Sequence, residues 1–355
     1  MFTITRYIPG VISSTHSDER TGMRVSMAQV AAHAGVSAQT VSRVANGSPR
    51  VDPATRARVE ASMATLGYRM HRAARALRTG QTRTIGLVVS TLASVGNSRM
   101  LQAIADAAGE RDYALAVVTV AGARDIAEAF AQLRDQGVDG AIVLNEATRL
   151  ARDTAPPADL RLVVVDSPPD DRFAIVQTDH AGGARQATQH LLELGHTTVH
   201  HLAGPAASFA ARERERGWRE ALLDADAAVP EVVRGDWTSR GGHAAGSALA
   251  DATAVFAAND QMALGLLRAF SDVGRAVPDA VAVVGFDDVV DAAEYRPPLT
   301  TVRQDFDALG AHAVAALVKV IETGAAAPSQ TVPTELVVRA SSAQRAGLRR
   351  GKAPR

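Results

Sequence analysis

Residues 34–46 read AGVSAQTVSRVAN, which is the pattern of a tight turn followed by a short helix. Gly35 stops a preceding helix, and Val36 points inward. Ser37 is a favourable N-cap, so the next helix is expected over residues 38–45. The sequence therefore predicts a helix, a four-residue turn and a second helix in this region.

Two more helical features are predicted on either side of this turn. Ser26 and Gln29 have the spacing of a capping box, in which each side chain bonds the backbone of the other at the start of a helix. Downstream, Asp52 is a suitable N-cap, Pro53 suits the first helical position, and a later glycine ends this third helix. We expect the three helices to share one small core as a helix-turn-helix headpiece over residues 26–70.

The second helix is polar on the side away from its valines. Glutamine can bond adenine and arginine can bond guanine in the major groove, while serine and threonine hold phosphates. A generic small helical domain with an arginine-rich surface is the alternative, but here the cap, the turn, the glycine and the polar face coincide. We therefore predict that this helix reads DNA. The residues expected to contact DNA from this region are Ser37, Ala38, Gln39, Thr40, Ser42, Arg43 and Asn46.

The chain has no net formal charge, but its charges are segregated. Residues 24–83 hold ten arginines and two acidic residues, a balance of +8, whereas residues 84–355 hold 26 basic and 34 acidic residues, a balance of −8. A basic module on an acidic body is typical of nucleic-acid binding, because neutralised phosphates supply much of the affinity for DNA. Charge alone fits a solvated basic surface equally well, so it only supports the helix-turn-helix prediction.

Composition disfavours several classes of protein. Without cysteine the chain can form no disulfide, thiolate zinc site or cysteine nucleophile, and we expect neither a metal nor another cofactor. No apolar run is long enough to cross a membrane, and residues 1–25 do not read as a signal peptide. We expect a disordered leader or a misplaced start there, and a cytoplasmic protein with no membrane partner.

Short apolar runs alternate with longer helical stretches beyond an arginine-rich linker over residues 71–83, which buries too little to be a stable helix alone. Such alternation predicts an α/β core of doubly wound parallel sheets, and the number of runs favours two subdomains with a cleft between them. Ligands of such sheets bind beyond the carboxyl ends of the strands, where Asp166, Asn259 and Asp287 stand. The predicted strands cover residues 85–89, 115–120, 141–144, 162–165, 199–202, 254–257 and 281–284.

The motifs of the chain resemble those of the lactose-repressor (LacI/GalR) family of bacterial transcriptional regulators, and within it most of all the branch that gives the family its name. The resemblance implies a repressor of a carbohydrate-utilisation operon that leaves a pseudo-palindromic double-stranded DNA operator when a small, galactoside-like sugar binds. It implies no enzymatic activity. The shared segments are AGVSAQTVSRVANG, VDPATRARVEASMATLGYR, LAGPAAS, ARERERGW, GDW, FAANDQMALG, GFDD and PPLTTVRQDF, and they reach to about residue 340.

The resemblance also implies an architecture. A hinge helix follows the headpiece, and its Leu77 wedges into the minor groove at the operator centre, with Arg72 and Ala74 beside it. The core resembles periplasmic sugar-binding proteins, in which the chain crosses three times between subdomains. No leucine heptads follow the core, which favours a homodimer over a tetramer. The expected pieces of the core (residues 84–340) are residues 84–178 with 304–333, residues 179–303 with 334–340, and then a disordered tail over 341–355.

Six side chains of the core are expected, by the same resemblance, to bind the effector. Carboxylates, an amide and a guanidinium can hold the vicinal hydroxyls of a pyranose, and an aromatic ring can pack on its apolar face. Some family contacts do not transfer, because Ala210, Gly96 and Asn97 replace other residues and Asn145 lies one place off the family asparagine. The identity of the sugar therefore stays open. The expected effector-binding residues are Asp166, Arg214, Trp237, Asn259, Asp287 and Phe306.

Three other functions fit part of the sequence. A glycosidase would also pair carboxylates around a sugar, but it would leave the headpiece unexplained. An exported sugar-binding protein shares the core fold, but it needs a signal peptide and no basic headpiece. A regulator of the same family with a purine or another non-sugar effector stays open, and ligand binding distinguishes it from a sugar-responsive regulator.

Overall fold

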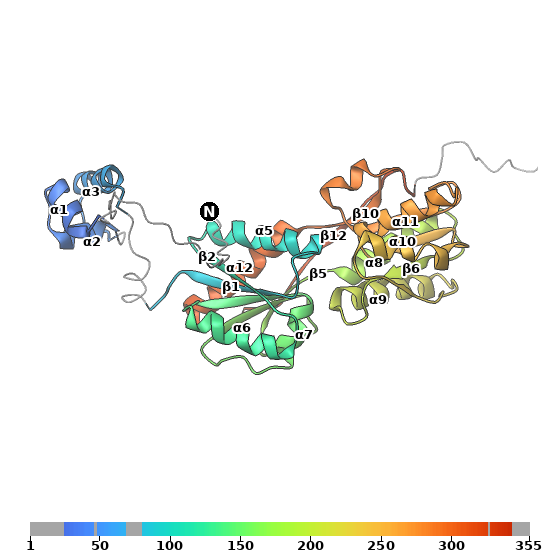
Figure 1. Ribbon diagram of the computed structural model, residues 1–355, viewed down its shortest axis with the longest axis horizontal. Coiled ribbons are helices and arrows are strands. Elements are labelled where there is room, and N and C mark those ends of the chain that lie inside the picture. The colour runs from blue at the N-terminus through green and yellow to red at the C-terminus, as the bar shows by residue number, and fades with distance from the viewer. Residues whose placement is uncertain (1–24, 46–47, 69–79, 326, 343–355) are drawn as a thin grey trace, which may run out of the picture. The chain divides into compact units, whose positions relative to one another are not determined.

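The computed structural model describes residues 25–45, 48–68, 80–325 and 327–342 of the 355-residue chain. The chain divides into two compact units, one that ends at Thr79 and one that begins at Gly80 (Figure 1). In its described part the first unit has three short helices, and the second has two parallel sheets with helices on both faces. The predicted combination of a helix-turn-helix headpiece and an α/β core is confirmed.

The helices of the headpiece are capped as predicted. The Ser26 hydroxyl accepts a hydrogen bond from the Gln29 N–H at 3.3 Å, and the Gln29 side chain accepts one from the Ser26 N–H at 2.7 Å. The Asp52 carboxylate accepts from the Thr55 N–H at 2.9 Å. Gly35 ends the first helix at φ 64°, a left-handed conformation that glycine adopts without strain. The helices are α1 (Met27–Ala34), α2 (Ala38–Ala45) and α3 (Pro53–Leu66).

One small apolar core holds these helices together. Val30, Val41 and Val59, one from each helix, are fully buried. Val25 packs against this core, although it falls in the predicted leader. The predicted leader therefore extends one residue too far, because the apolar side chain at position 25 finds a partner in the headpiece.

A single carboxylate fixes the start of the second unit. Asp139 accepts hydrogen bonds from the Thr82 N–H at 2.8 Å and from the Arg83 N–H at 2.9 Å. The Thr82 hydroxyl also donates to the Gly137 carbonyl at 2.7 Å. The predicted linker over residues 71–83 therefore ends too late, because its last residues are held by the α/β core.

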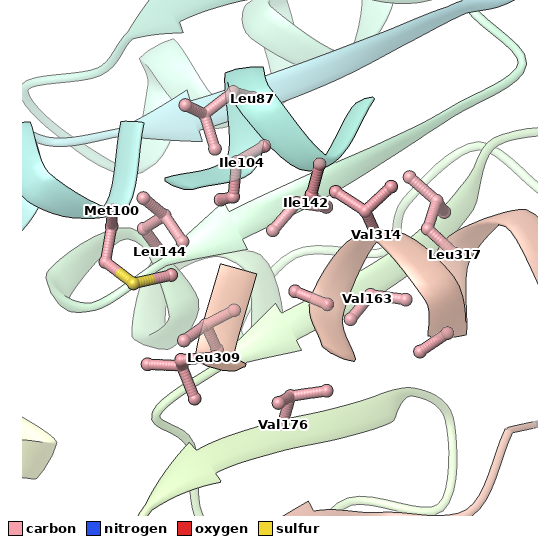
Figure 2. Close-up of a cluster of buried hydrophobic side chains, with 14 of the residues drawn as sticks. Leu87, Met100, Ile104, Ile142, Leu144, Val163, Val176, Leu309, Val314 and Leu317 are labelled. Atoms are coloured by element: carbon pink, nitrogen blue, oxygen red, sulfur yellow. The ribbon is translucent and has the colours of Figure 1, made fainter. Parts of the chain in front are cut away.

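The first sheet has six parallel strands in the order β11-β5-β4-β3-β1-β2. Helices α5 and α12 cover one face, and α6 and α7 cover the other, which is why the central strands are continuous apolar runs. Figure 2 shows the first of these layers, where Leu87 and Ile142 of the sheet and Leu309 and Val314 of α12 belong to one buried cluster. The elements are β1 (Thr84–Val89), α5 (Val95–Gly109), β2 (Ala114–Thr119), α6 (Ala123–Asp135), β3 (Gly140–Leu144), α7 (Glu146–Arg152), β4 (Arg161–Val165), β5 (Ala174–Thr178), α12 (Phe306–Thr323) and β11 (Gln330–Val332).

The second sheet also has six strands, in the order β12-β10-β9-β8-β6-β7, and only its edge strand β12 is antiparallel to its neighbour. Helices α8 and α9 cover one face, and α10 and α11 cover the other. The elements are α8 (His180–Glu193), β6 (His200–Ala203), α9 (Phe209–Asp224), β7 (Val233–Arg234), α10 (Ser239–Ala244), β8 (Ala254–Ala257), α11 (Asp260–Asp272), β9 (Ala282–Asp287), β10 (Thr300–Gln304) and β12 (Thr334–Val337), with 3-10 turns at Ser247–Leu249 and Val290–Glu294.

The chain passes between the two sheets three times, from β5 to α8, from β10 to α12 and from β11 to β12. Two of these crossings meet, because the Thr178 hydroxyl donates to the Gln304 side-chain oxygen at 2.9 Å. Residues just after β12 stay in the fold: Ser341 is buried, and its hydroxyl donates to the Val283 carbonyl at 2.6 Å. The prediction that a disordered tail begins at residue 341 is therefore wrong, because the backbone of the second sheet binds this serine.

Trp218 anchors α9 to the second sheet. Its side chain is fully buried, and its indole N–H donates to the Val199 carbonyl at 2.8 Å. Replacing Trp218 by Phe keeps a ring but leaves that carbonyl without its donor, so we expect the free energy of unfolding to fall by about 1–3 kcal/mol. Urea unfolding followed by circular dichroism measures the change.

The exposed Leu223 on the same helix provides the control for this substitution. Leu223→Ala is expected to change the free energy of unfolding by less than about 0.5 kcal/mol. Equal losses for Trp218→Phe and Leu223→Ala would contradict the anchoring role.

Candidate functional site

Several non-glycine residues with positive φ angles lie at or just after the carboxyl ends of strands in the two sheets. Asn145 follows β3 with φ 49°, Asp166 follows β4 with φ 56°, and Asp287 ends β9 with φ 117°. Trp237, after β7, has φ 71°. Such conformations are unfavourable for residues with a Cβ atom, and they cluster at functional sites. Here all four residues line the same pocket.

This pocket lies between the two sheets and encloses about 530 Å³ of empty space, including its open side. All six side chains expected to bind the effector line it, namely Asp166, Arg214, Trp237, Asn259, Asp287 and Phe306. Its other lining residues are Ser94, Gly96, Asn97, Met100, Asn145, Glu146, Ser208, Ala210, Gln304 and Leu309.

Arg214 is the central cation of the pocket. Only 4% of the residue is exposed, and its guanidinium lies 3.8 Å from the centroid of the Phe286 ring. One nitrogen donates to the Ala258 carbonyl, and the same nitrogen lies 3.5 Å from the Asp287 carboxylate. Burial lowers the pKa of Arg214, and the neighbouring Asp287 opposes that shift. The guanidinium is therefore held in a fixed orientation before any ligand binds.

Two carboxyl groups, those of Asp287 and Asp260, lie near Arg214 and near each other. Asp287 accepts a hydrogen bond from the Gln304 amide at 2.6 Å; burial raises the pKa of Asp287, whereas Arg214 lowers it. Asp260 is completely buried, where it accepts bonds from the Thr301 hydroxyl at 2.5 Å and the Val289 N–H at 2.9 Å. Burial, together with the charge of Asp287, raises the pKa of Asp260 well above its usual range. The pocket thus has one carboxylate paired with Arg214 and one structural carboxyl behind it.

Asn259 lines the pocket, but both the oxygen and the nitrogen of its side-chain amide make hydrogen bonds within the protein. Its oxygen accepts from the Met262 N–H at 3.0 Å and caps α11, while its nitrogen donates to the Trp237 carbonyl at 3.1 Å. The Trp237 ring is also fitted closely to the backbone, since a Cβ atom on Gly204 would lie 2.3 Å from it. Asn259 therefore positions the backbone of Trp237, and Gly204 leaves room for its indole ring.

The wall on the first sheet contains polar residues that the sequence reasoning left out. Asn145 donates its amide to Asn97, and Asn97 donates to the Thr91 carbonyl at 2.8 Å. Glu146, the first residue of α7, accepts from the Ser90 hydroxyl at 3.3 Å. Asn145 lies one place off the family asparagine, yet its position directly after β3 is a signal that points to the pocket.

The predicted DNA-reading residues can be followed only in part. Ser37, Ala38, Gln39 and Arg43 are exposed, whereas Thr40 and Ser42 are half-buried on α2. The Ser37 and Thr40 hydroxyls lie within hydrogen-bond distance of each other at 3.0 Å. Asn46, Arg72, Ala74 and Leu77 lie outside the described residues, so their roles stay predictions.

Neither a metal site nor a membrane span is found in the described part of the chain. Among those residues no group of three or more His, Asp or Glu side chains could hold a metal ion. No described helix is both long and apolar enough to cross a membrane.

Comparison with known proteins identifies the family. Bacterial regulatory proteins of the lacI family match residues 26–70, and a periplasmic binding protein-like domain matches residues 188–342. The HTH-type transcriptional regulator CelR of Thermobifida fusca is 38% identical over 338 residues, which are 90% of this chain and 98% of that protein. The chain belongs to the lacI family of bacterial regulatory proteins. A lacI-family protein of this kind is a helix-turn-helix transcription regulator and not an enzyme.

Two solved structures agree with this lacI-family assignment. A lac repressor dimer bound to operator and the anti-inducer ONPF matches with a TM-score of 0.79 and 33% identity over 90% of this chain and 99% of that one. A complex of CelR with cellobiose matches with a TM-score of 0.68 and 36% identity over 90% of this chain and 100% of that one. The prediction of a special likeness to the lactose branch is not supported, because CelR matches at comparable identity.

Proposed function

We propose that this regulator is a transcriptional repressor of a carbohydrate-utilisation operon, and that a small sugar in the pocket releases it from its operator. The observation that carries the proposal is the convergence of Asp166, Arg214 and Asp287 beside the Trp237 ring in one pocket. Vicinal hydroxyls need paired acceptors and donors, and the apolar face of a pyranose needs a ring to pack on. A neutral polyhydroxylated ligand uses all of these groups.

Both walls of the pocket supply polar groups that can contact a sugar. The second sheet supplies Arg214 and Asp287, while the first supplies Asn97, Asn145 and Glu146. A ligand that touches both walls can favour one relative orientation of the two sheets. The CelR structure holds cellobiose, and a lactose operon repressor of Escherichia coli is 36% identical to this chain, which makes cellobiose-like disaccharides and galactosides the first candidates here.

The headpiece supplies the DNA-binding half of the proposal. Gln39 and Arg43 are exposed on α2, where they can reach base edges, and Ser37 is exposed at the start of the helix, where it can hold a phosphate. The proposed operator is pseudo-palindromic and the proposed active form is a homodimer, since a two-fold operator mirrors a two-fold protein. The lac repressor structure matched above is a dimer bound to operator. We therefore propose that the protein acts at the chromosome, in the cytoplasm.

The direct test is operator affinity with and without sugar. Cellobiose, lactose and other mono- and disaccharides are screened first by thermal shift, because a ligand at a hundredfold its dissociation constant adds roughly 2.7 kcal/mol to stability. We expect the sugar that stabilises the protein to weaken operator binding, and operator to weaken sugar binding by the same factor.

Two outcomes would redirect the proposal. A thermal shift with purines and none with sugars would identify a regulator with a non-sugar effector. Identical operator affinity with and without every sugar of the panel would overturn the sugar-release proposal.

A further inference from the structure

A buried histidine joins the two walls of the pocket without lining it. His180 is the first residue of α8, just after the chain leaves β5 at Thr178, and only 2% of it is exposed. Its Nε2 atom lies 3.0 Å from the Asp166 carboxylate on the first wall, and the Arg214 Nε–H donates to its Nδ1 atom at 3.3 Å. The ring is therefore the link between the carboxylate of one sheet and the guanidinium of the other.

These contacts determine where the ring carries its proton. A guanidinium can only donate hydrogen bonds, so Nδ1 must accept and is unprotonated. A neutral imidazole then carries its proton on Nε2, which faces Asp166. This second contact is close but not aligned as a hydrogen bond, so its attraction is electrostatic. The Phe209 and Phe286 rings, with centroids 6.4 and 6.0 Å away, pack around the imidazole.

We propose that His180 is a positioning residue that holds Asp166 and Arg214 in register across the pocket, with its Nδ1 atom as the acceptor for Arg214. The inference rests on the proposed sugar-binding function, because Asp166 and Arg214 are two of the groups that hold the sugar. A proton on Nδ1 removes the acceptor of the Arg214 Nε–H and places a second cation against the guanidinium. Arg214 then loses one of the contacts that orient it toward the ligand.

The charged groups that face His180 come from three elements: Asp166 follows β4, Arg214 lies on α9, and Asp287 ends β9. Arg214 is also held by the Ala258 carbonyl and by Asp287, and these contacts fix the guanidinium whose Nε–H donates to the His180 Nδ1 atom.

The test measures the affinity of the full-length protein for cellobiose and for lactose by calorimetry at neutral pH. The His180→Gln side chain can accept from Arg214 through its oxygen and donate to Asp166 through its nitrogen. This variant is therefore expected to retain most of the wild-type affinity.

Two further variants separate positioning from packing. His180→Phe keeps a ring but has neither nitrogen, so its affinity is expected to be at least about tenfold weaker, as for loss of one hydrogen bond to a charged group. His243→Gln is the matched control, because His243 pairs with Asp272 on the surface, and it is expected to keep the wild-type affinity. The inference is overturned if His180→Phe binds as tightly as wild type, or if His180→Gln loses as much affinity as His180→Phe.

A second measurement needs no sugar. Nitrogen-15 spectra of the histidine rings, with the His180 signals assigned by their loss in His180→Gln, are expected to show a neutral ring protonated at Nε2 near neutral pH. A ring protonated at Nδ1 there overturns the inference whether or not a sugar binds. If the expected tautomer is found but no sugar binds, the position of the proton is supported and only the proposed function is contradicted.

Discussion

A chain that begins at Gly80 is expected to keep the pocket and to lose sequence-specific DNA binding. The headpiece has its own buried core, which shares no residue with the cores of the second unit among the described residues. Asp139 holds the second unit from Thr82 onward, so removal of the headpiece leaves the first strand anchored. Specific protein–DNA complexes are typically roughly a thousandfold to ten-million-fold tighter than non-specific ones. The affinity for operator is therefore expected to fall by at least about a thousandfold.

Fluorescence anisotropy measures this loss on an operator duplex that the full-length protein has selected from random DNA. The control is the thermal shift caused by the best-binding sugar, which is expected to be the same for the shortened and the full-length chains. For the full-length chain, affinity should also fall steeply with salt, because arginines that neutralise phosphates release counterions. Tight, sequence-specific binding by the shortened chain would show that the headpiece is not the DNA-reading unit.

The headpiece could be predicted closely because its signals are local. Ser26 and Asp52 each cap a helix through a backbone group three residues away, and Gly35 ends a helix by its own conformation. Such contacts need no knowledge of the rest of the fold. The same holds for strands β3, β4 and β8, whose apolar runs are covered on both faces.

Strands β5, β7, β10 and β11 were not among the predicted runs, for physical reasons. Strand β7 has two residues and β11 has three, which is too short for a recognisable pattern. Strand β10 reads TTVRQ, and its Thr300 and Thr301 are buried. Burial of these hydroxyls depends on bonds to the Arg339 carbonyl and to Asp260, 39 and 41 positions away in the sequence. The residues near the strand in the sequence give no indication of such distant partners.

The same distinction applies to the pocket. Asp166 and Asp287 could be predicted because polar residues directly after buried strands gather at one edge of a parallel sheet. His180 and Gln304 could not, because their roles arise where the chain crosses between sheets. The Gln304 side chain bonds Thr178, which is 126 positions away. Sequence reasoning thus finds the groups that strands present, and it misses those that connect the two walls.

Replacing Asp287 by Asn is expected to give a repressor that stays on its operator in the presence of sugar. The substitution keeps the shape of the side chain but removes the charge that lies 3.5 Å from Arg214. Hydrogen bonds to charged groups contribute about 1.5–3 kcal/mol, so the affinity for sugar should fall about tenfold to a hundredfold. A ligand shifts an equilibrium only as far as its affinities for the two states differ. A pocket that holds the sugar weakly therefore cannot release the DNA at the concentration that releases wild type.

Operator affinity without sugar should stay within about twofold of wild type, since mutations at sites that share no partners act independently and Asp287 belongs to the unit without the headpiece. Asp291→Asn is the matched control: this exposed aspartate lies in the 3-10 turn after β9, outside the pocket lining, so its loss should leave both sugar binding and release unchanged.

Arg214→Lys tests the other partner, because a lysine keeps the charge but loses the planar guanidinium that donates to Ala258 and His180 together. Anisotropy titrations with and without sugar compare all four proteins. Release of Asp287→Asn at the wild-type sugar concentration would show that this carboxylate has no part in the switch, and the same result for Arg214→Lys would extend that conclusion to its partner.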